Sequence, residues 1–166
     1  MKKHHLLFVI IVSIITTSCA QEKFTLKSPD VAALKKELTD SNYQVNTVLR
    51  YFEKNYKATS EKIDIKLDPD FDNAECGFTK KFEYGIVYTY YNCGEATPVK
   101  EEITLPKTSY SVLKKWIELT YKANGTEVKN TWYSSTEYGP HDKEAGCYYT
   151  IKQGEKNTII STWCGS

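Results

Sequence analysis

Three groups of side chains have residue types and spacing that suit a chemical role. The first is an acidic segment in which Asp68, Asp70 and Asp72 stand at alternate positions. This spacing aims several carboxylates at one hard cation, as a calcium loop does. An EF-hand loop that starts at Asp68 needs a bidentate glutamate at its twelfth position, where the chain has Thr79. A solvated acidic turn is therefore the first interpretation, and a calcium site at these three aspartates is the alternative.

The second group surrounds His141, the only histidine after residue 20. Any histidine-dependent catalysis would use this residue, with Ser134, Ser135 and Glu137 close by in the sequence. A lone loop histidine is more often a surface residue than a general base. The chain has no glycine-rich phosphate loop, no H-E-x-x-H and no G-x-S-x-G. We therefore predict no catalytic residue and no cofactor, and a hydrolase that uses His141 is the third functional hypothesis.

The third group consists of four cysteines in two equally spaced pairs. Cys76 and Cys93 enclose sixteen residues, as do Cys147 and Cys164, and both segments end in Cys-Gly. Four cysteines allow three connectivities. The spacing favours disulfides 76–93 and 147–164, each of which would stabilise the fold by about 3 kcal/mol. Cys19 is the odd fifth cysteine.

Each cysteine pair predicts a β-hairpin folded about its midpoint. The turns would fall at residues 84–85 and 155–156. With two-residue turns, both cysteine pairs occupy non-hydrogen-bonded positions, where a cross-strand disulfide fits best. A four-residue loop at 154–157 is the alternative for the second hairpin, and it would change this parity.

Alternation along these hairpins sorts the side chains onto two faces. The cysteine side would face the helices and carry Phe78, Phe82, Val87 and Tyr91 in the first hairpin. The opposite side would carry aromatic rings between lysines and hydroxyls, which is typical of a protein-recognition surface, although such rings also serve as ordinary cross-strand pairs. The predicted partner-binding residues on that side are Tyr88, Tyr90, Lys81, Tyr148, Trp163 and Lys152.

Residues 134–146 are predicted as an inserted loop. Tyr138-Gly139-Pro140-His141 forms a stiff turn in this interpretation, with an aromatic ring at its tip. Such a loop suits insertion into the cleft of a partner. Tyr138 and His141 are therefore added to the predicted partner-binding residues, with a variable surface loop as the alternative.

Helix and strand signals supply the frame for these groups. Ser28-Pro29-Asp30 is a helix entry with a hydroxyl at the N-cap. Apolar residues then recur at helical spacing up to residue 56, with an interruption at 39–42 that leaves one long helix or two. Residues 63–67 and 127–133 are predicted as strands and 112–117 as helix, while 98–106 link the two halves.

These elements predict an α+β fold built from two tandem repeats in one compact domain. Repeat 1 covers residues 29–97 and repeat 2 covers residues 98–166. Each repeat is a helix followed by an antiparallel β-hairpin sheet with one cross-hairpin disulfide. In plan this is similar to secreted inhibitors of hydrolases.

The N-terminus predicts export. Residues 1–20 combine lysines, a short apolar run and small residues, as a bacterial signal peptide does. Cleavage after Ala20 and lipidation at Cys19 are both compatible with its end, and residues 21–28 would form a short tether. The predicted location is the periplasm, the outer membrane through a lipid anchor, or the medium, where disulfides persist.

The charge balance narrows the choice of partners. After removal of residues 1–20, twenty basic residues stand against twenty-one acidic ones. This balance gives no general attraction to nucleic acid or anionic lipid, so membrane contact would come only from a lipid anchor. The leading prediction is a non-enzymatic envelope binding protein, of the inhibitor or immunity type, that contacts a hydrolase or toxin. The alternative is a structural or ligand-binding envelope lipoprotein, with calcium as its cofactor in one version.

Overall fold

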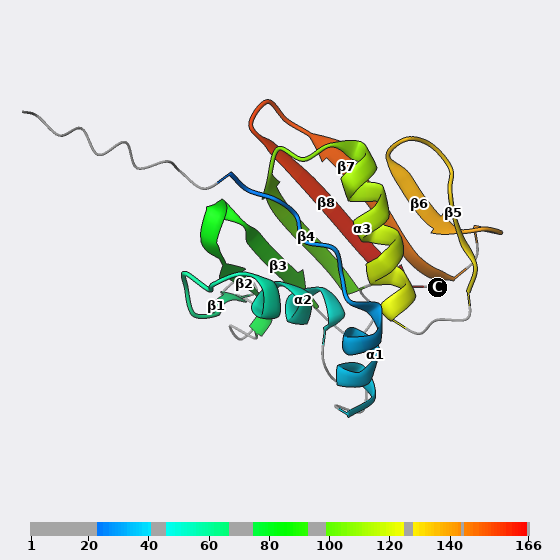
Figure 1. Cartoon of the computed structure of the whole chain (residues 1–166). Helices are drawn as coiled ribbons and strands as arrows, with labels where there is room; N and C mark the ends of the chain where they lie inside the picture. Colours follow the sequence, from blue (N-terminus) through cyan, green and yellow to red (C-terminus); the bar gives the residue numbers. More distant parts are fainter. Residues whose placement is uncertain are drawn as a thin grey trace, which may run out of the picture.

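The computed structural model describes residues 23–40, 46–66, 75–92, 99–124, 128–143 and 145–165. Within these ranges, three α-helices and one eight-stranded antiparallel sheet form an α+β fold (Figure 1). The helices are α1 (Val31–Asp40), α2 (Thr47–Asn55) and α3 (Tyr110–Ala123). The strands are β1 (Ile63–Lys66), β2 (Glu75–Lys81), β3 (Val87–Tyr91), β4 (Val99–Pro106), β5 (Asn130–Trp132), β6 (Glu137–Pro140), β7 (Gly146–Gln153) and β8 (Asn157–Gly165).

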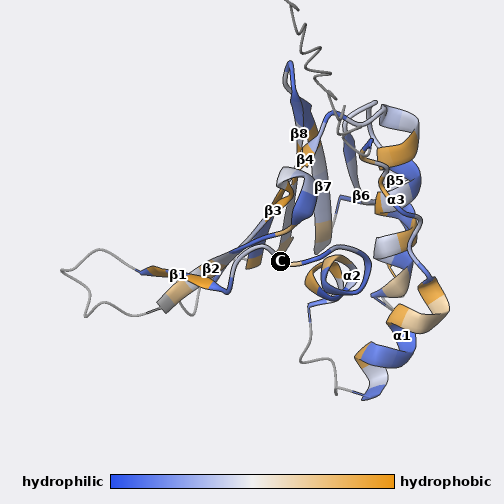
Figure 2. Cartoon of the chain, turned by 60° about the vertical axis from the view of Figure 1, so that its left-hand side comes forward, coloured by the Kyte–Doolittle hydropathy of each residue, from blue (hydrophilic) through white to orange (hydrophobic). Residues whose placement is uncertain are grey.

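The strand order is β1-β2-β3-β4-β8-β7-β6-β5. At the centre of the sheet β4, the strand before α3, pairs with β8 from Val99↔Cys164 to Pro106↔Asn157. All three helices lie on one face of the sheet, as the view in Figure 2 shows. We call the other face, which carries none of the described helices, the open face.

The helices α1 and α2 each start where a side chain satisfies one of the first backbone N–H groups. At α2, the side chain of Asn46 accepts a hydrogen bond from the backbone N of Leu49. At α1, Asp30 accepts from the backbone N of Ala33 at 3.0 Å, so the capping residue is Asp30 and not the predicted Ser28.

The core lies between the helices and the sheet. The rings of Tyr51 and Phe52 on α2 pack edge-to-face on each other, with centroids 5.0 Å apart, and both contact Trp116 of α3. The sheet contributes Phe82, Ile86 and further apolar side chains that are fully buried. One core therefore joins the two halves of the chain.

Residues 99–106 are a central strand, so the prediction of a linker at 98–106 is wrong. Glu101, Ile103 and Leu105 alternate with half-buried or exposed side chains and are themselves buried. This is the period-2 pattern of a strand with one face in the core. A glutamate at a core position and prolines at both ends of the segment conceal the pattern.

The second hairpin has the predicted register. Cys147 pairs with Cys164 in β7 and β8, and the two form a disulfide with Cα atoms 4.1 Å apart. The backbone N of Gly154 donates to the carbonyl of Asn157, which closes a two-residue turn at 155–156. Cys76 is also disulfide-bonded, and its predicted partner Cys93 lies outside the described residues, as does Cys19.

The first hairpin is shifted by one residue from the predicted register. Its turn has three residues, Glu83–Gly85, because Tyr84 and Gly85 both adopt positive φ, at 61° and 75°. Phe78 therefore pairs with Tyr90 instead of Tyr91. A slip of one residue moves every side chain of a strand to its other face. The predicted faces are wrong for β3, so that Tyr88 and Tyr90 lie on the helix side.

The predicted loop 134–146 contains strand β6. Tyr138 is only 7% exposed and contacts the rings of Trp132, Tyr121 and Tyr149 in the core. Burial raises the pKa of Tyr138 to about 12. The prediction of an aromatic loop tip is therefore wrong for this residue.

The segment that precedes α1 lies against the body of the protein. Residues 21–28 are predicted as a tether, and their described part begins at Lys23. Leu26 is buried, the backbone N of Lys27 donates to the Tyr56 hydroxyl, and that hydroxyl donates to the carbonyl of Thr25. Phe24 contacts the rings of Tyr56 and Tyr84.

Candidate functional site

The open face carries two neighbouring cross-strand rows of different character. One row runs from Tyr91 through Lys100 and Trp163 to Tyr148. The next row holds hydroxyls and carboxylates and consists of Thr79, Thr89, Glu102, Ser161, Thr150 and Glu137. Adjacent rows lie two residues apart along each strand, which is about 7 Å. An aromatic and cationic row thus lies beside a polar row.

Trp163 and Tyr148 form the most prominent aromatic pair of the open face. Their ring centroids are 4.7 Å apart at an interplanar angle of 40°. Trp163 is 44% exposed, although large aromatic side chains are usually well buried. The pair matches the predicted placement of these two residues on the face away from the helices.

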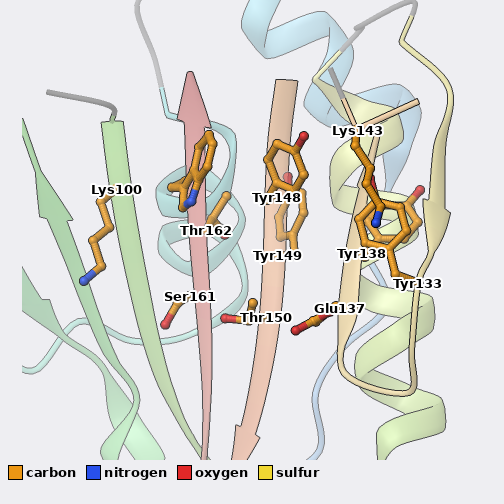
Figure 3. A pocket seen from close by; sticks show the side chains of 11 residues that line it. Lys100, Tyr133, Glu137, Tyr138, Lys143, Tyr148, Tyr149, Thr150, Ser161 and Thr162 are labelled. Carbon is orange, nitrogen blue, oxygen red and sulfur yellow. The ribbon is translucent and has the colours of Figure 1, made fainter. Parts of the chain in front are cut away.

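A depression of about 340 Å³ lies beside this pair. Across the sheet its lining runs from Lys100 on β4 and Ser161 on β8, past Thr150 and Tyr148 on β7, to Tyr133 and Lys143 (Figure 3). Concave, largely aromatic sites of this size are typical of places where a protein takes up a side chain or a small ligand.

Two lysines flank the aromatic surface. The ammonium of Lys100 lies 5.6 Å from the ring centroid of Tyr91, and that of Lys143 lies 5.4 Å from the centroid of Tyr133. Glu137 is the one carboxylate among the residues that line the depression. The local charge therefore favours an acidic group on the ligand.

Gly139 in β6 makes room for these rings. A Cβ atom at this position would lie 2.6 Å from Cδ1 of Tyr148 and 3.1 Å from Cε2 of Tyr133. The ring of Tyr148 is thus seated directly over the glycine.

Gly139→Ala is expected to displace Tyr148 and to lower the free energy of unfolding by about 1 to 2 kcal/mol, as overpacking does. Urea unfolding would measure this change. In a Tyr148→Ala background the same substitution is expected to cost much less, because the clashing ring is gone. Equal costs in the two backgrounds would contradict this packing.

The predicted partner-binding residues do not all meet. Tyr88 is fully buried and Tyr90 is half-buried beside Phe78 on the helix side. Lys81 and Lys152 are exposed on the open face, but they stand at opposite ends of one row. Tyr148 and Trp163 come together at the depression, and the buried Tyr138 also contributes to its lining.

His141 is exposed in the turn after β6. Its Nδ1 lies 2.8 Å from Oδ1 of Asp142, and both side chains are largely open to solvent. The hydroxyl of Ser134 accepts hydrogen bonds from the backbone N of Thr136 and of Glu137. The nearby serine hydroxyl thus supports a local turn.

The predicted calcium ligands Asp68, Asp70 and Asp72 lie outside the described residues. In the part of the chain that is described, no three or more His, Cys, Asp or Glu side chains gather as a metal site would require.

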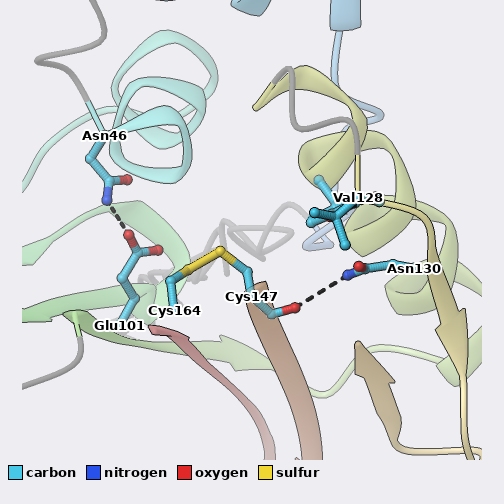
Figure 4. The surroundings of a disulfide bond; sticks show 7 residues. Asn46, Glu101, Val128, Asn130, Cys147 and Cys164 are labelled. Atoms are coloured by element: carbon cyan, nitrogen blue, oxygen red, sulfur yellow. Dashed lines mark hydrogen bonds between the residues drawn. A yellow bond between two sulfur atoms is a disulfide. The ribbon is translucent and has the colours of Figure 1, made fainter. Parts of the chain in front are cut away.

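A buried carboxylate on the helix side was missed by sequence reasoning. Glu101 of β4 is 8% exposed and accepts a hydrogen bond from Nδ2 of Asn46, the residue that caps α2 (Figure 4). Burial raises the pKa of Glu101 to about 7. Hydrogen bonds with the side chains of Asn46 and Tyr88 lower this pKa and offset part of the rise. The sequence signal was the alternation through residues 101, 103 and 105.

Tyr133, Lys143 and Lys100 at the depression were also missed. Tyr133 ends the predicted strand 127–133 and Lys143 lies in the predicted loop 134–146. In the structure Tyr133 lies between β5 and β6 and Lys143 in the turn after β6, and both line the depression.

Comparisons with protein-family models, with curated proteins and with solved structures found no match. Across the described ranges, none of the helices has the length and apolar character needed to cross a bilayer.

Proposed function

We propose that this chain is an exported, non-enzymatic binding protein of the bacterial envelope, of the inhibitor or immunity type, and that it captures another protein on its open face. The observation that carries the proposal is the Trp163–Tyr148 pair, exposed beside a depression on a sheet face that carries none of the described helices. Exposed aromatic residues next to a concave site are the usual anchors of protein interfaces.

The chemistry of the depression suggests what the partner presents. Aromatic carbon lines much of it, and Lys100 and Lys143 stand on either side. An apolar side chain flanked by acidic residues complements this arrangement. A hydrolase or toxin with such a protruding segment fits the proposal.

The frame beneath the site supports tight binding. The 147–164 disulfide links the two strands that carry Tyr148 and Trp163. Because the disulfide already restricts these strands, the surface loses less conformational entropy when it binds a partner. Helical structure precedes the meander β1–β4 and again the meander β5–β8. We include in the proposal that the chain is built from two tandem repeats, with their boundary after β4 instead of after residue 97.

Trp163→Ala is expected to weaken partner binding by about 2 kcal/mol, or roughly thirtyfold. The partner would first be isolated from envelope extracts with the oxidised protein as bait and a reduced, alkylated copy as control. Calorimetry with the purified partner would then give both dissociation constants.

Tyr110→Ala is the matched control, because Tyr110 is a similarly exposed aromatic residue at the start of α3. It is expected to bind the partner as tightly as the unmodified protein. A partner that binds Trp163→Ala with unchanged affinity would count against the open face. Equal losses in both variants would contradict a role specific to Trp163.

A further inference from the structure

A second cavity lies on the helix side of the sheet, away from the proposed interface. Its volume is about 270 Å³, and its lining includes Glu101, Thr162 and Cys164 from β4 and β8. Leu38 of α1, the start of α2 and Asn124 at the end of α3 complete it. Figure 4 shows that the disulfide and Glu101 lie in the same part of the molecule.

The cavity contains hydrogen-bonding capacity that the described residues leave unused. Thr162 is 4% exposed, and its hydroxyl has no hydrogen-bond partner among them. A buried polar atom without a partner costs about 1 to 3 kcal/mol and therefore calls for a ligand or ordered water.

The charge around the cavity is negative. Glu101 accepts one hydrogen bond from Asn46, and no described lysine or arginine forms a salt bridge with it. Leu38 lies in the last turn of α1 and Asn124 caps the C-terminus of α3, and helix C-termini carry partial negative charge. The N-terminus of α2 carries partial positive charge, but the side chain of Asn46 already accepts a hydrogen bond from one of its free N–H groups.

We propose that this cavity binds a compact organic cation with N–H donors, a primary ammonium on a short apolar chain. The Glu101 carboxylate is its counter-ion, and the unpartnered Thr162 hydroxyl accepts one of its N–H groups. Leu38 and Val48 contact the apolar chain. The volume equals that of about nine water molecules in the liquid, which suits a ligand of this size.

The ionisation of Glu101 supports the assignment. Burial raises the pKa of this carboxyl to about 7. The other titratable group that acts on it is Tyr88, and burial raises the pKa of Tyr88 above its ordinary value. A bound ammonium would stabilise the carboxylate and lower its pKa again.

The test is titration of the oxidised protein with n-butylammonium at pH 8, followed by calorimetry and by the 13C chemical shift of the Glu101 carboxyl. n-Butanol is the neutral isostere. We expect saturable binding of n-butylammonium, at least tenfold tighter than binding of n-butanol, and a lower midpoint for the Glu101 titration. Absence of saturable binding, or equal binding of the two compounds, overturns the proposal.

Two variants identify the contacts. Glu101→Gln is expected to weaken n-butylammonium binding at least tenfold. Thr162→Val is expected to weaken it severalfold while leaving the melting temperature of the free protein unchanged or higher, because it removes an unpartnered hydroxyl. Unchanged binding in Glu101→Gln overturns the proposal. These measurements do not involve Trp163. Their outcome therefore tests the cavity alone, and the proposed open-face interface is tested separately by Trp163→Ala.

Discussion

Glu101→Gln is expected to stabilise the free protein at pH 8 and to leave its stability nearly unchanged at pH 4. The carboxyl has an ordinary pKa of 4.5 in the unfolded chain and about 7 in the fold. Between these values the folded state holds more protons, so the stability that Glu101 contributes is present below pH 4.5 and is lost as the pH rises through 7. The loss is about 3 kcal/mol above pH 7.

Glutamine removes this pH dependence and keeps the local hydrogen bond. Its carbonyl can accept from Nδ2 of Asn46 as the carboxylate does. Urea unfolding of both proteins at pH 4 and pH 8 would measure the difference. Glu102→Gln is the matched control, because Glu102 is the next residue of β4 and lies half-buried on the open face. If Glu101→Gln has the same free energy of unfolding as the unmodified protein at pH 8, the buried carboxylate does not destabilise the fold.

Replacing Cys147 and Cys164 together by serine is expected to lower the free energy of unfolding by about 3 kcal/mol. The bridge joins residues 17 apart, and on the chain-entropy model a loop of this length accounts for that loss. Urea unfolding of the double variant would measure it. Substitution is preferable to reduction, because Cys76 is also disulfide-bonded and a reductant would act on both bridges.

The same double variant also tests the frame of the open face. Tyr148 and Trp163 directly follow and precede the two cysteines, on paired strands. If the bridge holds these rings in place, partner binding should fall in the double variant even at temperatures where it is folded. A loss of stability below about 1 kcal/mol would show that the hairpin holds its register without the bridge.

The second hairpin could be predicted from sequence because its turn falls at the midpoint that the cysteine spacing gives. The cysteine spacing and the two-residue turn at 155–156 both place Cys147 opposite Cys164, and this register puts Trp163 and Tyr148 on the open face. In the first hairpin the turn does not fall at that midpoint. The positive φ of Tyr84 makes the turn one residue longer, and tyrosine gives no sign of that conformation.

The site is only partly predictable for a related reason. Trp163 and Tyr148 come from neighbouring strands, so local alternation places them. Lys100 reaches them through the pairing of β4 with β8, and Glu101 meets Asn46 through packing of α2 on the sheet. Such long-range contacts have no local signature in a single sequence. A glutamate at a core position also breaks the apolar pattern that would have identified β4.

The pairing of β4 with β8 has a consequence for how the chain folds. Val99 must find Cys164 across the whole of α3 and the strands β5, β6 and β7. Contacts between such distant residues slow folding, because the chain must close a long loop before the contacts stabilise it. We expect refolding in the millisecond-to-second range typical of non-local topologies. Until this central pair forms, β4 and β8 would each expose unpaired backbone groups at a sheet edge, and such edges favour aggregation.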